Sequence, residues 1–493
     1  MKRIIAVLAM TILILPLKAQ VNQKESYEEY RNRMRSEMRR YNDAVKQDYE
    51  NFRQKANEEY AQFMRERWEE YQSLKGDPTP EIPEPPQPYE RERDKEVLVP
   101  KLPIKFDQVI TLPKPEEKPK EPEKRPTPVV PNTPSVPEFN FVCYGTSCTV
   151  HMDKNLKFKL KDCSEQSVAD VWDQLTSETF EVLLEDCLNL REELALGDWA
   201  YFCLIRDLSE TFLGKETNEA VLFETYLMAQ SGYKLRIGRK DNNLILMLPF
   251  DNVVYETVSI TLDGVKYYVI DNGKTGGYYV FNRSFMDNER ILSLRMKQAP
   301  KFAFKSGGEK TFVSKRYPDL KVTMAMNKNL MDFYTNYPKT LWTNYSWVGL
   351  SDDVKAKLYP MLRKGIEGKS QIEAANRLIN FVQTAFEYKT DGQQFGYERS
   401  FFPDETFFYP YSDCEDRSIL FSVLMRDLLH VDVALLHYPD HLATAVHYTE
   451  TLQGTYFTMD GKTFYVSDPT YIGANVGECM PRYVNTNPKV YLL

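Results

Sequence analysis

Histidine is scarce in this sequence: the chain has five in 493 residues, and none lies between residues 152 and 429. Four of the five follow closely on one another between residues 430 and 447. An imidazole is the side chain that most often activates a nucleophile near neutral pH. A nucleophile and an imidazole therefore cannot be paired within the long middle stretch, and chemistry of that kind is confined to the C-terminal part.

Basic charge is not in excess, because 63 Lys and Arg are outnumbered by 71 Asp and Glu and the net charge is −8. We therefore do not expect a nucleic acid as the main partner, since phosphate binding needs a surplus of basic side chains. The sequence has no CxxC pair and no cluster of His and Cys, so we predict no metal and no cofactor. Beyond the N-terminus, no segment is long and apolar enough to span a bilayer.

The N-terminus has the pattern of a secretory signal peptide over residues 1–20. Lys2 and Arg3 form a basic start, residues 4–17 are apolar, and Ala19 offers a small-residue cleavage site. The apolar run is short for a stable membrane span. We expect an exported protein, periplasmic or secreted, with no integral membrane segment once the signal is removed.

Export bears on the seven cysteines, because oxidising compartments permit disulfides. Setting Cys414 aside leaves an even set, and spacing alone does not choose among its pairings. One of these pairings joins Cys143 to Cys148 and would close a hairpin. The six are Cys143, Cys148, Cys163, Cys187, Cys203 and Cys479.

Residues 21–75 predict one long amphipathic helix of the coiled-coil type, helical from about Tyr27 to Tyr71. From Tyr30 on, aromatic and apolar residues follow steps of four, four and three, which is an 11-residue period. One helix cannot bury such a stripe by itself. We expect self-association or an unknown protein partner, with a solvated spacer helix as the other interpretation.

Residues 76–137 form a proline-rich region that holds 17 of the 29 prolines. Proline fixes the backbone and removes a hydrogen-bond donor, so this region favours extended, semi-rigid polyproline II structure. We interpret it as a spacer between the helix and the globular part of the chain. The remainder divides into an α/β domain over 138–290, a connecting region over 291–369 and a C-terminal domain over 370–493.

An internal repeat links two parts of this remainder. Thr261–Asp271, TLDGVKYYVID, and Thr458–Asp468, TMDGKTFYVSD, are identical at six of eleven positions. Helix-forming stretches precede both segments at matching distances, with Asn218 in the first where Cys414 stands in the second. We infer a duplicated helix-plus-sheet module. Its first copy lacks Cys and His at the corresponding places, so that copy is structural or binds a ligand.

Cys414 lies in YSDCEDRSILFSVLM, residues 411–425, at the expected start of a buried helix. Either Ser412 or Asp413 can cap this helix. The helix dipole stabilises a thiolate in the first turn, whereas the neighbouring carboxylates raise the pKa of the thiol. Cys414 is thus a nucleophile that needs an imidazole partner, or one half of a disulfide, or an inert buried thiol.

Histidines follow the cysteine closely. His430 is expected to cap the end of the helix, and His437 lies in an apolar stretch. His441 opens a strand on which it shares one face with His447. Asp468 ends a later strand, so Cys414, His441 and Asp468 occur in chain order at intervals of 27 residues. The last two meet at one sheet edge if residues 450–462 are an excursion, and lie at opposite edges if a full strand intervenes.

Three short motifs, YSDCED, HLATAV and SDPTY, together resemble the transglutaminase-like, or papain-like, superfamily of cysteine enzymes. The helix-forming stretch IEAANRLINFVQTAFEYKTD before the cysteine also fits that family. The resemblance covers residues 370–475. It implies an α+β core in which the cysteine helix packs on an antiparallel sheet, with Cys414 as nucleophile, His441 as general base and acid, and Asp468 as the orienting carboxylate.

The resemblance leaves the oxyanion donor open. Gln393, Gln394 and Tyr411 are side-chain candidates upstream of the cysteine, and the backbone N–H of Cys414 is the safer expectation.

The sequence therefore predicts an exported cysteine-dependent acyl-transfer enzyme that hydrolyses a peptide or amide bond, or cross-links through a lysine amine. Its substrate is a peptide or protein. The alternative is a non-catalytic binding or scaffold protein that keeps the fold and acts through its helix and degenerate copy. A third interpretation, a disulfide between Cys414 and Cys479, makes the cysteine purely structural.

Overall fold

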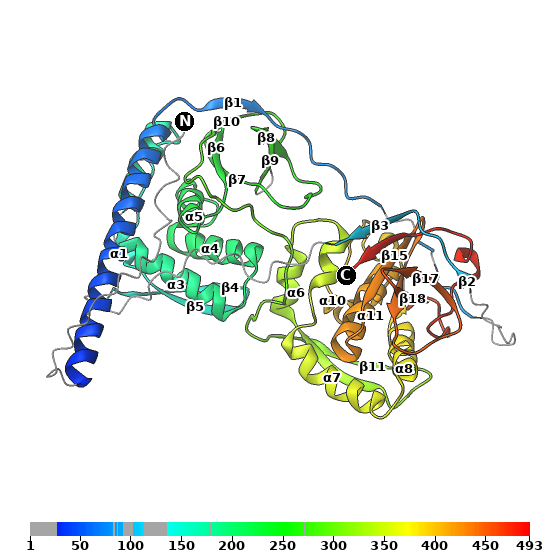
Figure 1. Cartoon of the computed structure of the whole chain (residues 1–493). Coiled ribbons are helices and arrows are strands. Elements are labelled where there is room, and N and C mark those ends of the chain that lie inside the picture. Colours follow the sequence, from blue (N-terminus) through cyan, green and yellow to red (C-terminus); the bar gives the residue numbers. More distant parts are fainter. Residues whose placement is uncertain are drawn as a thin grey trace. The chain divides into compact units, whose positions relative to one another are not determined.

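The computed structural model describes residues 27–81, 84–85, 87–91, 102–112, 136–176, 179–270 and 273–493. The fold is α+β and is built largely from antiparallel sheets, as expected (Figure 1). The predicted signal peptide lies outside the described residues. Within the described ranges, no helix combines the length and apolarity needed to cross a bilayer.

Helix α1 (Tyr27–Met64) ends earlier than the sequence predicted. Trp68 is buried just beyond its end and donates its indole N–H to the carbonyl oxygen of Met64 at 3.1 Å. The chain then forms strand β1 (Glu69–Gln72), which pairs with β10 (Gly277–Phe281) at the edge of a sheet. Residues 69–72 were expected to be helical, but an open sheet edge offers backbone partners that override a local helical pattern.

The stripe on α1 is partly buried within the chain. Tyr60 packs on Trp172 and Phe281, with ring centroids 4.9 and 5.0 Å away. Farther toward the N-terminus the stripe is open, with Met38 and Tyr41 62% and 67% exposed. A partner for that exposed part of the stripe remains a prediction.

The first sheet has six strands in the order β1-β10-β6-β7-β9-β8, all antiparallel. A hairpin and four helices lie between β1 and β6 in the chain. Helices α4 and α5 pack against each other, and α5 packs against β7. The elements are β4 (Glu138–Cys143), β5 (Thr146–His151), α2 (Glu165–Leu175), α3 (Thr179–Glu193), α4 (Asp198–Leu213), α5 (Asn218–Gln230), β6 (Arg236–Lys240), β7 (Asn243–Leu248), β8 (Ser259–Leu262) and β9 (Val265–Val269).

The second sheet has seven strands in the order β2-β17-β18-β16-β15-β19-β3. Helix α11 (Cys414–Leu429) packs on β15 and β16, and α8 (Gln371–Thr384) packs on α11 (Figure 1). The sheet strands are β15 (Val433–Tyr438), β16 (His441–His447), β17 (Thr455–Met459), β18 (Lys462–Ser467), β19 (Lys489–Leu492), β2 (Leu102–Pro103) and β3 (Gln108–Thr111).

Five strands of the two sheets follow the same path. The first sheet contains the order β10-β6-β7-β9-β8, and the second contains β19-β15-β16-β18-β17, which is the same sequence of strands counted along the chain. The register also agrees: Thr261 pairs with Lys266, and the residues 197 positions further on, Thr458 and Thr463, pair with each other. A duplicated module predicts both features.

The chain between β10 and α8 contains few strands. It contributes the hairpin β11 (Ser306–Val313) and β12 (Lys321–Asn327), then α6 (Lys328–Thr335), the 3-10 helix η2 (Trp342–Trp347) and α7 (Asp352–Ile366). Helix η2 contacts α11, and α7 packs on β12 and α8. Short elements before the cysteine helix are β13 (Glu387–Tyr388), α9 (Asp391–Gln394), α10 (Glu405–Phe408) and β14 (Tyr411–Ser412).

The proline-rich region is not only the spacer that the sequence suggested. Its described parts add β2 to one edge of the second sheet and β3 to the other, both in parallel orientation. Pro103 is tolerated because edge strands leave one side of the backbone without ladder partners. Composition predicted the extended backbone, whereas only the folded sheet provides edges for it to pair with.

Candidate active site

Helix α11 begins at Cys414, directly after its N-cap residue Asp413. The cysteine is fully buried, packed in a small cluster with Trp342, Leu435 and Leu442. Ser418, one turn further on, donates its hydroxyl to the carbonyl oxygen of Leu442 at 2.9 Å. This bond ties the start of the helix to strand β16 and sets the position of the thiol.

His441 and Asp468 meet at one edge of the sheet. The imidazole Nε2 lies 2.8 Å from Asp468 Oδ2, and both side chains are buried. The geometric expectation was wrong in one respect: Thr455–Met459 is a full strand, yet it does not separate the pair. Strand β17 lies on the outer side of β18, so β18 pairs directly with β16 and its end faces the start of β16.

The loop after β18 fixes the carboxylate of Asp468. Its Oδ1 accepts the backbone N–H groups of Thr470 and Tyr471 at 2.8 and 3.2 Å. Gln383 on α8 is buried and donates its amide to the carbonyl oxygens of Asp468, Tyr471 and Ala474 at 3.2, 2.7 and 3.1 Å. The second carboxylate oxygen is thereby left to face the imidazole.

The orientation of the His441 ring is supported by stacking on Tyr483. The two ring centroids lie 5.1 Å apart, with an interplanar angle of 7°. If Nε2 of a neutral imidazole donates to Asp468, the other ring nitrogen is an acceptor. That atom, Nδ1, is buried and has no hydrogen-bond partner among the described residues.

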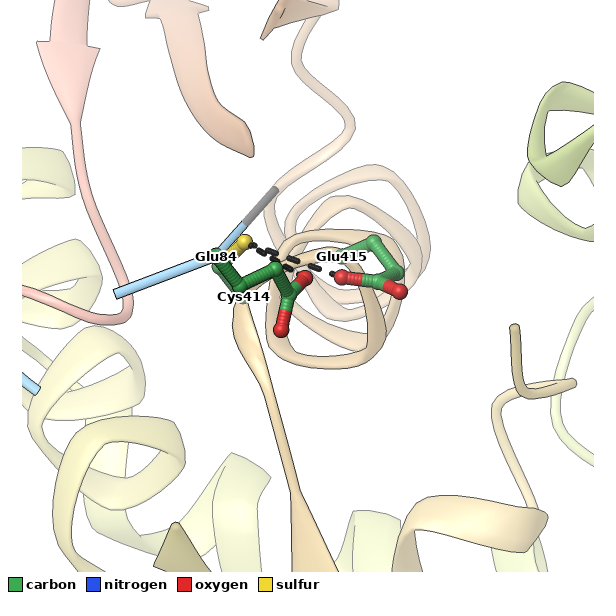
Figure 2. Close-up of side chains that lie close together, drawn as sticks. All are labelled: Glu84, Cys414 and Glu415. Atoms are coloured by element: carbon green, nitrogen blue, oxygen red, sulfur yellow. Dashed lines mark hydrogen bonds between the residues drawn. The ribbon is translucent and has the colours of Figure 1, made fainter. Parts of the chain in front are cut away.

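The Cys414 sulfur contacts three groups. The backbone N–H of Leu442, the residue after the histidine, donates to Sγ at 3.3 Å. Glu84, from the proline-rich region, accepts from the thiol with Oε1 at 3.0 Å, and Glu415 Oε2 lies 3.6 Å away (Figure 2). No hydrogen bond joins Sγ to His441 within the described part of the chain.

Buried carboxyl groups surround the thiol. Burial, then the charges of Glu415 and Asp413, raise the pKa of Cys414 well above its usual value. Burial and Asp413 raise the pKa of Asp391 to about 10 and that of Glu415 well above its ordinary range. Arg417 is a buried counter-charge to Asp413 and Asp416, and burial lowers its pKa to about 10. Arg399 is a counter-charge to Asp391.

Among the described residues, two groups of side chains have ligand atoms close enough to hold a metal ion. One is Glu84, Cys414 and Glu415, and the other is Asp391, Glu398 and Glu415. A sulfur with carboxylates suits a zinc-type ion, and carboxylates alone suit a harder cation. The sequence analysis predicted no metal site, and spacing had no means of finding the first group, since Glu84 and Cys414 are 330 residues apart.

Other predicted residues have ordinary roles. His430 caps the end of α11 in the left-handed conformation, as expected. Gln394 exchanges hydrogen bonds with the backbone of Tyr411, so it is not aimed at the thiol. All seven cysteines are free thiols, so neither a Cys143–Cys148 bridge nor a Cys414–Cys479 bridge is present.

Sequence reasoning missed Glu84, Gln383, Tyr388 and Tyr483. Tyr388 donates its hydroxyl to the carbonyl oxygen of Pro85 at 2.8 Å, beside the thiol-facing Glu84. Gln383 and Tyr388 lie in the helix-forming stretch before the cysteine that the sequence analysis noted, but nothing in that stretch distinguished these two residues from their neighbours.

Comparisons with models of protein families, with curated proteins and with solved structures found no match.

Proposed function

We propose that this protein is an exported cysteine enzyme that transfers an acyl group, with Cys414 as nucleophile, His441 as base and acid, and Asp468 as orienting carboxylate. The observation that carries the proposal is the His441–Asp468 pair at 2.8 Å, with the neighbouring Leu442 N–H on the cysteine sulfur. These groups come from α11, β16 and the end of β18. A nucleophile, a base and a group that orients the base are the parts that acyl transfer needs.

The reaction follows from these positions. His441 Nδ1 accepts the Sγ proton, and the thiolate attacks an amide carbonyl carbon to form a C–S bond. The imidazolium gives the proton to the amine nitrogen as the C–N bond breaks, which leaves a thioester. Water, deprotonated by the same imidazole, then attacks the thioester and releases a carboxylic acid and the thiol. The backbone N–H groups at the start of α11 are the proposed oxyanion donors.

We favour hydrolysis of a peptide or amide bond, and the substrate class is a peptide or protein. Support for a transglutaminase-like core comes from the three motifs and from a cysteine helix packed on an antiparallel sheet. The duplicated module is supported by the shared strand order. Its first copy has Asn218 at the start of α5 and Asn243 at the start of β7, where the second copy has Cys414 and His441.

The proposal is tested by the pH dependence of Cys414 alkylation with iodoacetamide, compared with the His441→Ala variant. At pH about 6, an ordinary thiol is less than about 1% thiolate, so we expect the wild type to react about 10²-fold faster than the variant. Equal rates at every pH, or alkylation only after unfolding, would contradict the proposal.

The second candidate is a binding or scaffold protein without catalytic activity. It is favoured by the burial of Cys414 and by the hydrogen bond of its thiol to Glu84 in place of His441. The exposed apolar stripe on α1 suits such a protein. The alkylation experiment separates the two candidates, because a scaffold has no need of an imidazole-activated thiol.

A further inference from the structure

The described residues of 84–91, which we call the strap, run past the proposed active site. At one end, Glu84 Oε1 accepts from the Cys414 thiol at 3.0 Å. At the other end, the strap follows the loop that holds Asp468: Tyr89 O accepts from Ile472 N–H at 2.9 Å, and Arg91 N–H donates to Ile472 O at 3.0 Å. The strap thus touches both the nucleophile and the loop that positions the carboxylate.

The strap is bound as an extended peptide is bound. Glu90 and Ile472 form a parallel β-bridge, and the Pro85 carbonyl oxygen receives a hydrogen bond from Tyr388. Backbone hydrogen bonds to an extended segment are a common means of peptide recognition.

Side chains add further contacts. Tyr89 packs edge-on against Tyr471 at 5.5 Å, and Arg91 Nε lies 3.2 Å from Glu478. The strap therefore presents to this surface an aromatic residue and, two positions later, a basic one.

The strap also changes the hydrogen bonding of the thiol. A thiol can donate one hydrogen bond, and here Cys414 donates it to Glu84. The buried Nδ1 of His441 has no hydrogen-bond partner among the described residues. Nδ1 is the atom that has to accept the thiol proton for catalysis. A carboxylate oxygen facing Sγ presents no carbonyl carbon that the thiolate can readily attack, so the strap occupies the site without reacting.

We infer that the strap is a built-in occupant of the substrate groove, which limits the reaction of Cys414 to a minor open state until an extended peptide of similar chemistry displaces it. This inference rests on the proposed function. Glu84 leaves the thiol when the strap lifts, and the proton of Sγ becomes available to His441. Tyr388, Tyr471 and Glu478 then contact the substrate in place of the strap.

The test measures the rate of Cys414 alkylation in the full chain across the pH range, by peptide mapping. Two changes release the strap in different ways: Glu84→Ala removes the acceptor, and Tyr89→Ala with Arg91→Ala loosens the far end without touching the thiol. If the open form is a minor state of about 0.1–10%, release raises the rate about 10- to 1,000-fold. The synthetic peptide EIPEPPQPYER, residues 81–91, should slow the loosened variant again.

The matched control is Glu81→Ala, because Glu81 is an exposed glutamate in the same segment, three residues before Glu84. It should behave as the wild type does. The inference is overturned if neither release variant reacts faster than the wild type, or if the peptide gives no protection.

Adding His441→Ala to the released chain separates the two proposals. If release accelerates alkylation and loss of the imidazole abolishes reactivity at acidic pH, both stand. If release accelerates alkylation but the imidazole has no effect, the strap stands and the triad fails. If the wild type is already fast and dependent on His441, and release changes nothing, the triad stands and the strap fails.

Discussion

Asn218 and Cys414 occupy matching places beside the five-strand pattern that the two sheets share. Asn218 is the first residue of α5, and Cys414 is the first residue of α11. Each accepts a hydrogen bond from the second residue of a strand, which is β7 for Asn218 and β16 for Cys414. Leu244 N–H donates to Asn218 Oδ1 at 2.8 Å, and Leu442 N–H donates to Cys414 Sγ at 3.3 Å. One position thus joins a helix start to a strand in both sheets, and only one of the two carries a thiol.

Asn218 is therefore expected to have a structural role. Its amide also donates to the carbonyl oxygen of Asn242 at 2.9 Å, so Asn218→Ala leaves backbone groups without partners. We expect a loss of about 1–3 kcal/mol in the free energy of unfolding, measured by urea denaturation.

The matched change Asn243→Ala, at an exposed residue of the same sheet, should cost less than about 0.5 kcal/mol. Neither variant should alter Cys414 alkylation. A change in thiol reactivity with Asn218→Ala would mean that the first module takes part in the chemistry.

The second prediction concerns the tautomer of His441. Asp468→Asn places either an amide N–H or an amide oxygen opposite Nε2. Where the N–H faces the ring, Nε2 becomes the acceptor and the proton moves to Nδ1, which then cannot accept from the thiol. We expect the rate of alkylation at acidic pH to fall about 10²- to 10⁴-fold with the fold retained.

The control for this change is Asp432→Asn, an exposed carboxylate paired with Lys462. It should leave the pH profile unchanged. An Asp468→Asn protein with the wild-type profile would show that the carboxylate does not orient the imidazole.

The third prediction concerns Gln383. Its buried side-chain amide donates hydrogen bonds to three carbonyl oxygens of the loop after β18. Gln383→Met keeps the length of the side chain but leaves those oxygens without their donor. We expect the free energy of unfolding to fall by about 1–3 kcal/mol.

Gln383→Glu should be worse, because a carboxylate faces three acceptors. Both variants should slow alkylation through Asp468. A stable Gln383→Glu protein would disprove the proposed role of the amide.

The fourth prediction is a pH dependence of stability. Burial and Asp413 raise the pKa of Asp391 to about 10, so the folded chain keeps a proton that the unfolded chain loses near pH 4. More protons are then bound in the folded state between these values, and stability falls as pH rises. The slope is up to about 1.4 kcal/mol per pH unit for one proton.

Asp391→Asn removes this titration, so its stability should fall less steeply between pH about 5 and 9 than that of the wild type. Urea denaturation at several pH values measures the slope, and Asp432→Asn serves as the exposed control. Parallel slopes for Asp391→Asn and the wild type would show that Asp391 is charged in the folded protein.

Local pattern was sufficient for several parts of the site. The helix that starts at Cys414, the strand that starts at His441 and the strand that ends before Asp468 follow from short-range signals. The cap was left open between Ser412 and Asp413, and the structure has Asp413. The helix end beyond Met64 was predicted wrongly, because the residues after it pair with a strand more than 200 positions away. Pairing partners at such a distance leave no periodic trace in the local sequence.

The sequence by itself determined which side chains exist for the chemistry and in what order, since histidine is confined almost wholly to the end of the chain. It also contained the signal on which the proposed duplication rests, because two similar segments lie 197 residues apart. Only the tertiary structure decided that β17 lies outside β18 and so lets His441 meet Asp468. It alone brought Glu84 to the thiol, because that contact depends on chain packing across 330 residues and not on any local preference.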